Sequence, residues 1–202
     1  GSSVIMDGRF DDDKSLIFNY GTTTAITTTS TTPIVIMAIR LAPSVDNGTT
    51  GLLGAKEIIN RSQLQLTELG LYTTGTGYLI NLILNGYASG AMSGSFVSPV
   101  QSASGITSSF AQIALNTNAV NVTGGESVAA AYTNATSQTT LDLSQVRDLG
   151  NSILGGGTSN TVPTSQAGFY PDGPDILYVV ATPLTSTSST ILARLSWKEA
   201  QA

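Results

Sequence analysis

Acidic side chains are the residues of this sequence whose type and spacing come closest to a chemical site. Asp7 precedes a run of Asp11, Asp12 and Asp13, and hard cations such as Ca²⁺ bind where several carboxylate oxygens converge. The spacing does not match the EF-hand loop, because no alternating Asp series leads to a Gly and a terminal Glu. We therefore expect a solvated acidic patch, with a weak cation site at Asp11, Asp12 and Asp13 as the alternative.

Paired carboxylates are a second chemistry that the chain could perform, because most glycosidases need only two acids. The acids outside the N-terminal cluster stand singly, in predicted strands, caps and turns where Asp and Glu have structural reasons to occur. A glycosidase would need two of them about 5 to 9.5 Å apart in a cleft, and it stays our third hypothesis. The candidates are Glu57, Glu68, Glu126, Asp142, Asp148, Asp172 and Asp175.

The sequence contains no His and no Cys, which removes the common catalytic and metal-binding chemistries. Ser-His-Asp and Cys-His catalysis, imidazole metal sites and Cys/His zinc sites all require these residues. The glycines at Gly155, Gly156 and Gly157 lack the Lys and hydroxyl residue of a phosphate-binding loop. We predict that the protein is not an enzyme and binds no cofactor.

Composition limits the partners. The chain has 8 basic and 13 acidic residues and a formal net charge of -5, which disfavours binding to nucleic acid or to an anionic membrane surface. No apolar run approaches the roughly 20 residues that a membrane-spanning helix needs. Only 10% of residues are charged, whereas 28 Thr and 24 Ser supply small hydroxyls. Such a composition favours pleated strands joined by polar turns.

Hydrophobic patterns predict the individual strands. The apolar run from Pro33 to Pro43 is typical of a strand buried on both faces. Farther on, Leu64 and Leu66 alternate with polar residues, which predicts a half-buried strand. Residues 78–85 alternate in the same way, and the intervening "TTGTG" turn predicts that these two strands form a hairpin.

The remaining segments complete an all-β protein. We expect an antiparallel β-sandwich or jelly-roll-like domain with at most one short helix, in "DLSQVRDLG" at residues 142–150. Residues 1–32 are interpreted as an N-terminal arm, a first strand and a Thr-rich extended segment, and residues 33–202 as one domain. Further strands are expected at Ser15–Tyr20, Ser95–Gln101, Ser108–Leu115, Glu126–Thr133, Ile176–Ala181 and Thr190–Trp197.

The last two strands carry the apolar residues most favoured for a core or a subunit interface. Trp197, the only Trp, alternates with Leu195 and Ile191 on one apolar face, and Tyr178 lies in the preceding strand. We expect this terminal pair of strands to close a sheet or to lie between subunits, since closure hides edges that would otherwise recruit other chains.

Several segments resemble virion structural proteins of tailed bacteriophages, marine and cyanobacterial phages in particular. They are "QTTLDLSQVRDLGNSILGGG", "FYPDGPDILYVVATPL" and "ILARLSWKEAQA", together about the last 65 residues, with "GYLINLILNGYASG" and "SFVSPVQ" compatible. The resemblance implies a non-enzymatic, self-associating subunit of a phage particle, as a fibre, an appendage or a capsid decoration. It implies identical subunits as partners, with a trimer by analogy, together with other virion proteins and a location in the virion.

A carbohydrate- or receptor-binding surface module, at a fibre tip or in an adhesin, is the alternative hypothesis. Its partner would be a host surface glycan, bound by exposed aromatic side chains. The alternative predicts that Tyr72, Tyr87, Tyr132 or Tyr170 cluster on a loop surface, whereas scaffolding predicts apolar area buried between copies.

Overall fold

The structure, a computed structural model, is built from antiparallel β-strands, and its described residues contain no helix. It describes residues 16–42, 44–47, 57–59, 62–89, 96, 109–115, 121–144, 153–154 and 174–200. Most of the predicted arm (residues 1–15), the predicted strand Ser95–Gln101 except Phe96, and residues 145–150 of the predicted helix lie outside the described residues.

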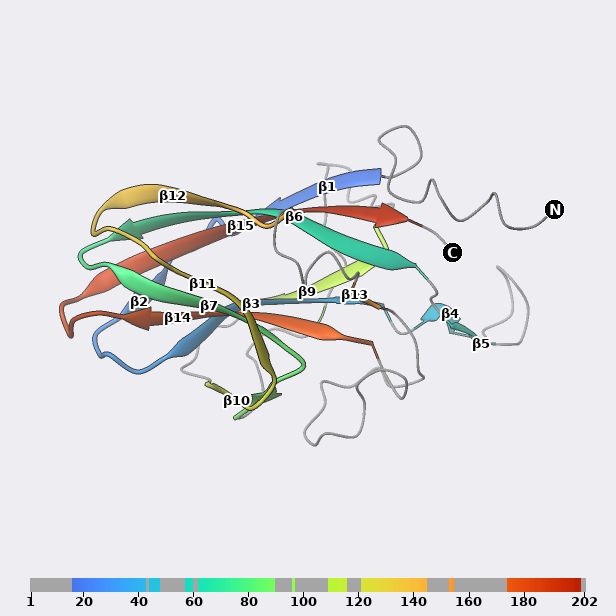
Figure 1. The fold of residues 1–202 in the computed structure, drawn as a ribbon, viewed down its shortest axis with the longest axis horizontal. Helices are drawn as coiled ribbons and strands as arrows, with labels where there is room; N and C mark the ends of the chain where they lie inside the picture. Colours follow the sequence, from blue (N-terminus) through green and yellow to red (C-terminus); the bar gives the residue numbers. More distant parts are fainter. Residues whose placement is uncertain are drawn as a thin grey trace.

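The strands form two main sheets that lie face to face (Figure 1). Sheet A has the order β1-β15-β6-β12, with β2 also paired to β15 and β13 to β6, and sheet B has the order β11-β7-β14-β3-β9. Sheet A contains β1 (Leu16–Gly21), β2 (Ile26–Thr28), β6 (Gln63–Thr74), β12 (Ser137–Asp142), β13 (Ile153–Leu154) and β15 (Ser189–Ala200). Sheet B contains β3 (Ile34–Leu41), β7 (Tyr78–Leu84), β9 (Ala111–Leu115), β11 (Glu126–Tyr132) and β14 (Ile176–Pro183). Two small sheets pair β4 (Ser44–Asn47) with β5 (Glu57–Ile59) and β8 (Tyr87–Ala88) with β10 (Val122–Thr123).

The pairing of the long strands is that of a jelly roll. Eight strands are six or more residues long: β1, β3, β6, β7, β11, β12, β14 and β15. Along the chain, the first of these pairs with the last (β1 with β15), and the second pairs with the seventh (β3 with β14). The third pairs with the sixth (β6 with β12), and the fourth with the fifth (β7 with β11). Contacts of β15 with β6 and of β14 with β7 join these pairs into the two sheets. A long hairpin rolled up in this way is the eight-stranded jelly roll, so the predicted fold class is confirmed.

The C-terminal strands occupy the middle of the sandwich. β14 lies between β7 and β3, and β15 lies between β1 and β6. They belong to different sheets, so our expectation that they close a sheet as a pair was wrong. The continuous apolar run of β14 follows from coverage of both of its faces, because seven of its eight residues are buried. β1 and β2 lie within residues 1–32, which the sequence analysis interpreted as an arm, a first strand and a Thr-rich extended segment. Both strands pair with β15.

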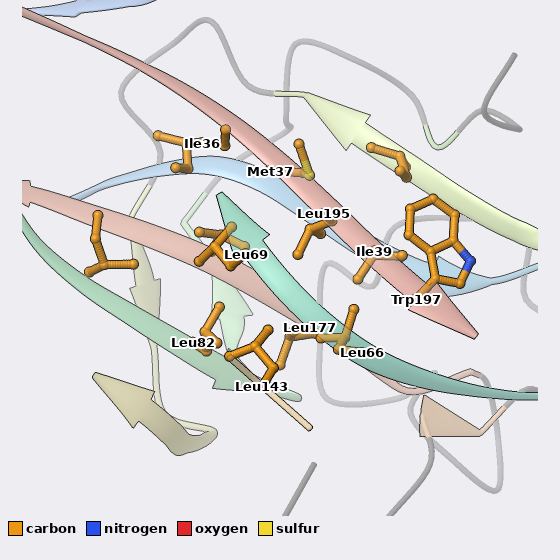
Figure 2. Close-up of a cluster of buried hydrophobic side chains, with 14 of the residues drawn as sticks. Ile36, Met37, Ile39, Leu66, Leu69, Leu82, Leu143, Leu177, Leu195 and Trp197 are labelled. Atoms are coloured by element: carbon orange, nitrogen blue, oxygen red, sulfur yellow. The ribbon is translucent and has the colours of Figure 1, made fainter. Parts of the chain in front are cut away.

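Apolar side chains fill the space between the sheets, and a second cluster covers the outer face of sheet B. Ile36 and Ile39 of β3 face the inner core, whereas Val35 and Ala38 belong to the outer cluster. All eight residues of β3 are buried, which confirms the prediction of a strand covered on both faces. Figure 2 shows part of the inner core, with Leu66, Leu69, Leu195 and Trp197 from sheet A and Ile36, Met37, Ile39, Leu82 and Leu177 from sheet B.

The alternation predicted for β6 and β7 is confirmed, but the hairpin is wrong. Leu64, Leu66, Ile80 and Leu82 are buried, and their neighbours along each strand are half-buried. β6, however, belongs to sheet A and β7 to sheet B, so the turn after Thr74 carries the chain from one sheet to the other.

Of the other predicted strands, β1, β9 and β11 lie close to their predicted positions. β12 was not predicted, and Asp142, where the short helix was expected to start, is its last residue.

Candidate functional site

The four residues assigned to a core or an interface are all buried within this one chain. Trp197 and Leu195 have no exposed surface, and Ile191 and Tyr178 are each 1% exposed. The Trp197 ring stacks on Phe18 of β1, with ring centroids 6.0 Å apart. Trp197, Leu195 and Ile191 lie in the inner core, and Tyr178 lies in the outer cluster of sheet B. Their side chains therefore offer no free surface to a partner.

A buried carboxylate that the sequence analysis did not select ties the two sheets together. Glu199 of β15 is 4% exposed and lies beside the start of β9 in sheet B. Four donors surround it: Ser109 Oγ at 2.5 Å, Ala111 N at 3.3 Å and Trp197 Nε1 at 2.8 Å from Oε1, and Phe110 N at 2.9 Å from Oε2. Such a set satisfies a buried charge, and it gives Glu199 a structural role.

A buried cation lies on the outer face of sheet B. Arg40 is 2% exposed, its guanidinium lies 4.2 Å from the centre of the Phe96 ring, and its Nε donates to Gln112 Oε1 at 2.9 Å. Burial lowers the pKa of Arg40 to about 10, and the nearby Tyr178 partly offsets that shift. Burial raises the pKa of Tyr178 to about 12, against an opposing effect of Arg40. At neutral pH Arg40 is charged and Tyr178 is neutral, so neither group acts there as a base.

Hydroxyl groups hold together the end of the sandwich where the chain crosses between sheets. Tyr78 OH donates to Ser189 Oγ at 2.7 Å, and Thr28 Oγ1 lies 2.8 Å from Ser189 Oγ and 3.2 Å from Tyr78 OH. Thr74 and Thr190 make a further hydroxyl contact of 2.6 Å. The Thr and Ser hydroxyls at this end of the sandwich therefore hydrogen-bond to one another and to the turns. These hydrogen bonds explain why the hydroxyl residues are there without a bound ligand.

Three of the acids that were candidates for a carboxylate pair are engaged locally, whereas Glu126 is exposed at the start of β11. Glu68 forms an ion pair with Arg194, Asp142 Oδ1 accepts bonds from Ser144 N (2.9 Å) and Oγ (2.5 Å), and Asp175 Oδ1 accepts one from Asn85 Nδ2 (2.7 Å). The bonds from the Ser144 side chain and backbone lower the pKa of the exposed Asp142.

The described residues contain no group of three or more acidic side chains placed to hold a metal ion. Asp11, Asp12 and Asp13 lie outside the described residues. Within the same part of the chain, no helix is long and apolar enough to cross a membrane.

The exposed tyrosines lie on three different sheets. Tyr72 is 47% exposed in β6 of sheet A, Tyr132 is 69% exposed in β11 of sheet B, and Tyr87 is 37% exposed in the small β8–β10 sheet. Tyr170 lies outside the described residues. The three described side chains therefore belong to separate surfaces of the fold.

One side of the sandwich opens into an apolar slot. β12 is the last strand of sheet A and β11 the last strand of sheet B, and a cavity of about 150 Å³ lies between them. The apolar walls of the slot are formed by Ile80 and Leu82 of β7, Ala129 and Ala131 of β11, and Leu141 and Leu143. Asp142 also lines the slot. Figure 2 shows Leu82 and Leu143, which come from opposite walls, close together. This slot with its two flanking strand edges is the candidate functional site.

No protein-family model and no curated protein matches the chain. Among solved structures, the chain matches two of infectious bursal disease virus, of the Gx and Gt strains, at 10% sequence identity. Each match covers 94% of this chain and 41% of the other chain, with TM-scores of 0.19 and 0.17. This chain thus spans about two fifths of the length of those proteins, and scores this low carry no argument about its fold or function.

Proposed function

We propose that the chain is a non-enzymatic virion structural protein, a self-associating subunit of the particle of a tailed bacteriophage. It would serve as a fibre, an appendage or a capsid decoration, with identical subunits and other virion proteins as its partners. The observation that carries the proposal is the jelly-roll pairing of its eight long strands. Jelly rolls form viral capsid domains, lectin domains and cupins among other proteins, so the fold supports this set of candidates without choosing among them.

The composition favours the structural member of that set. Because the sequence contains no His, the usual imidazole ligands of transition metals are missing, which weighs against a metal-dependent enzyme. Glu68, Asp142 and Asp175 are held in local structural contacts, which supports a non-enzymatic role. The resemblance of the C-terminal segments to phage virion proteins supports the same conclusion, since fold alone does not establish function.

Binding to a host glycan is the second candidate, and one observation favours it. Tyr132 is 69% exposed and immediately precedes the β11–β12 turn, which carries Thr133, Asn134 and Thr136. An exposed ring beside polar groups is a common sugar contact. A glycan array would test this, and specific binding that is lost in Tyr132→Ala would favour a receptor-binding module over a purely structural subunit.

The first test of the proposed function is the solution mass of the purified chain, measured by light scattering over a concentration series. A stable multimer supports an assembly subunit; a trimer would match the analogy with fibre proteins, and a dimer would require a two-fold contact between copies. A mass equal to one chain at every concentration contradicts self-association.

A further inference from the structure

The open side of the sandwich presents strand edges that none of the described residues covers. Within the part of the chain that the structure describes, β12 pairs only with β6, and β11 pairs only with β7. An unpaired strand edge offers a row of N–H and C=O groups to any chain that can align with it. Here two such edges flank an apolar slot, so the same contact could satisfy backbone groups and cover apolar side chains.

β12 lacks the Pro, the basic residues and the bulge that often protect a strand edge. Its sequence, SQTTLD, has no Pro, Lys or Arg, and its register with β6 runs without a bulge from Ser137 to Asp142. β11 is less suited to pairing, because its register shifts between Ser127 and Ala129. A bulge twists an edge away from incoming strands, whereas a regular edge of short side chains permits pairing.

The sequence of β12 is complementary to itself when two copies run antiparallel. In a continuous sheet, opposite residues must face the same side, so a two-fold axis passes through one residue of the strand. With the axis at Thr140, each Gln138 lies opposite Asp142 of the other copy, and each Thr139 lies opposite Leu141. Gln138, Thr140 and Asp142 are exposed in the single chain, whereas Thr139 and Leu141 are half-buried on the inner face.

We infer that a second copy of this chain docks edge to edge along β12, with Thr140 on the two-fold axis, and covers the slot between β11 and β12. The inference rests on the proposed function, since it names the surface through which the subunit associates. The slots of the two copies then lie next to each other, and Leu141 of each copy is removed from water.

The charges on this side of the molecule are compatible with such a contact. Each copy has a net charge of -5, so an interface that opposed acid to acid would be repelled. In the register centred on Thr140, Asp142 meets the amide of Gln138 in the other copy, which can donate a hydrogen bond to it. The two Asp142 carboxylates lie at opposite ends of the paired strands.

The first experiment adds a charge to the edge and measures the mass of the full chain by sedimentation. In Thr140→Lys the two new ammonium groups would face each other across the axis, so the dimer should be lost at a concentration where the unmodified chain is fully associated. Ile17→Lys is the matched control, because Ile17 is 58% exposed on β1, the opposite edge of sheet A. It should leave the mass unchanged, and circular dichroism should show that both variants are folded.

The second experiment uses the absence of Cys in the sequence to read the register directly. Thr140→Cys should form a disulfide-linked dimer under mild oxidation. Gln138→Cys and Asp142→Cys should each cross-link poorly alone but form a mixed dimer together, because those positions face each other. Ile17→Cys is again the control, and cross-linking of Ile17→Cys as fast as Thr140→Cys would overturn the inference.

The outcomes separate this interface from the proposed function. A multimer that survives Thr140→Lys overturns the β12 interface and leaves self-association standing. An unmodified chain that stays monomeric at every concentration overturns the interface and self-association together.

Discussion

At the scale of single residues, Arg40 and Tyr178 make opposite contributions to stability at alkaline pH. Burial raises the pKa of Tyr178 from 10.0 to about 12, so the folded state holds this proton more tightly and stability falls as pH rises through that range. Burial lowers the pKa of Arg40 from 12.5 to about 10, so the unfolded state binds more protons between those values and stability rises. The two effects largely cancel in the unmodified protein.

Replacing Tyr178 with Phe should remove the alkaline loss of stability that the buried phenol causes. Between about pH 9 and about pH 11, the destabilisation that Tyr178→Phe causes relative to the unmodified protein should shrink by about 1 kcal/mol, because the falling contribution of the phenol is gone. Urea unfolding of both proteins at the two pH values measures this difference. Tyr132→Phe is the control variant, because it removes the same hydroxyl from a ring that is 69% exposed. An unchanged difference for Tyr178→Phe would contradict the buried, protonated phenol.

The sequence pointed to Trp197 but not to Glu199, and the reason is physical. The alternation that turns Leu195 and Trp197 inward also turns Glu199 inward, so the pattern contained the signal. A carboxylate is almost never fully buried without partners, however, and three of its four donors, from Ser109, Phe110 and Ala111, lie about ninety residues away in the chain. Nothing local to Glu199 predicts that they arrive there.

At the scale of the elements, the turn between β6 and β7 determines how the chain passes from one sheet to the other. Gly75 has a φ of +86°, and a Cβ there would lie 2.5 Å from the carbonyl oxygen of Ser188 in the β14–β15 turn. Gly75→Ala should therefore suffer backbone strain and a clash with a neighbouring turn, and we expect a loss of about 2 to 4 kcal/mol in the free energy of unfolding.

Gly124 provides a matched comparison for this turn. It also has a positive φ, of +66°, but a Cβ there would meet no atom within 4 Å. Gly124→Ala should cost only the backbone strain, about 1 kcal/mol. Thermal or urea unfolding of the two variants measures the difference, and equal losses would show that the approach to Ser188 adds nothing.

Local patterns predicted the strands but not their partners. Alternation showed that β6 and β7 each bury one face. Two neighbouring strands of one sheet and two strands in facing sheets show the same alternation, so the pattern cannot distinguish these arrangements. A short turn favoured a hairpin, yet the third and fourth strands of a jelly roll are joined by a similarly short crossing. β12 was missed because Leu141 is its only apolar residue, so SQTTLD carries too little hydrophobic alternation to be distinguished from a loop.

At the scale of the whole molecule, the jelly roll places β15, the last strand of the chain, beside β1, the first strand, so β1 depends on β15 for its place in sheet A. Phe18 of β1 pairs with Trp197 of β15, and β15 separates β1 from β6 in sheet A. Such distant pairings carry a loop-closure cost in entropy before any contact repays it, so the sandwich is expected to form late and cooperatively.

Removal of β15 should therefore abolish the fold rather than trim it. A chain that ends before Ser189 loses the central strand of sheet A, leaves the facing edges of β1 and β6 unpaired, and lacks Trp197 and Glu199 from the core. We expect it to show no cooperative unfolding transition by circular dichroism and to aggregate through the exposed edges. Retention of a cooperative transition would mean that sheet A does not depend on its central strand.

Supplying the missing strand as a separate peptide distinguishes loss of that strand from general damage to the chain. A peptide of residues 189–200 can enter between β1 and β6 by strand addition, because its register with both is fixed by buried residues such as Leu195 and Trp197. The cooperative transition should return with this peptide and fail to return with the same peptide carrying Trp197→Ser, which buries a hydroxyl where the Phe18 ring now stacks. Equal rescue by both peptides would show that backbone pairing alone completes the sheet. Rescue by the first alone would show that the Trp197 side chain is required as well.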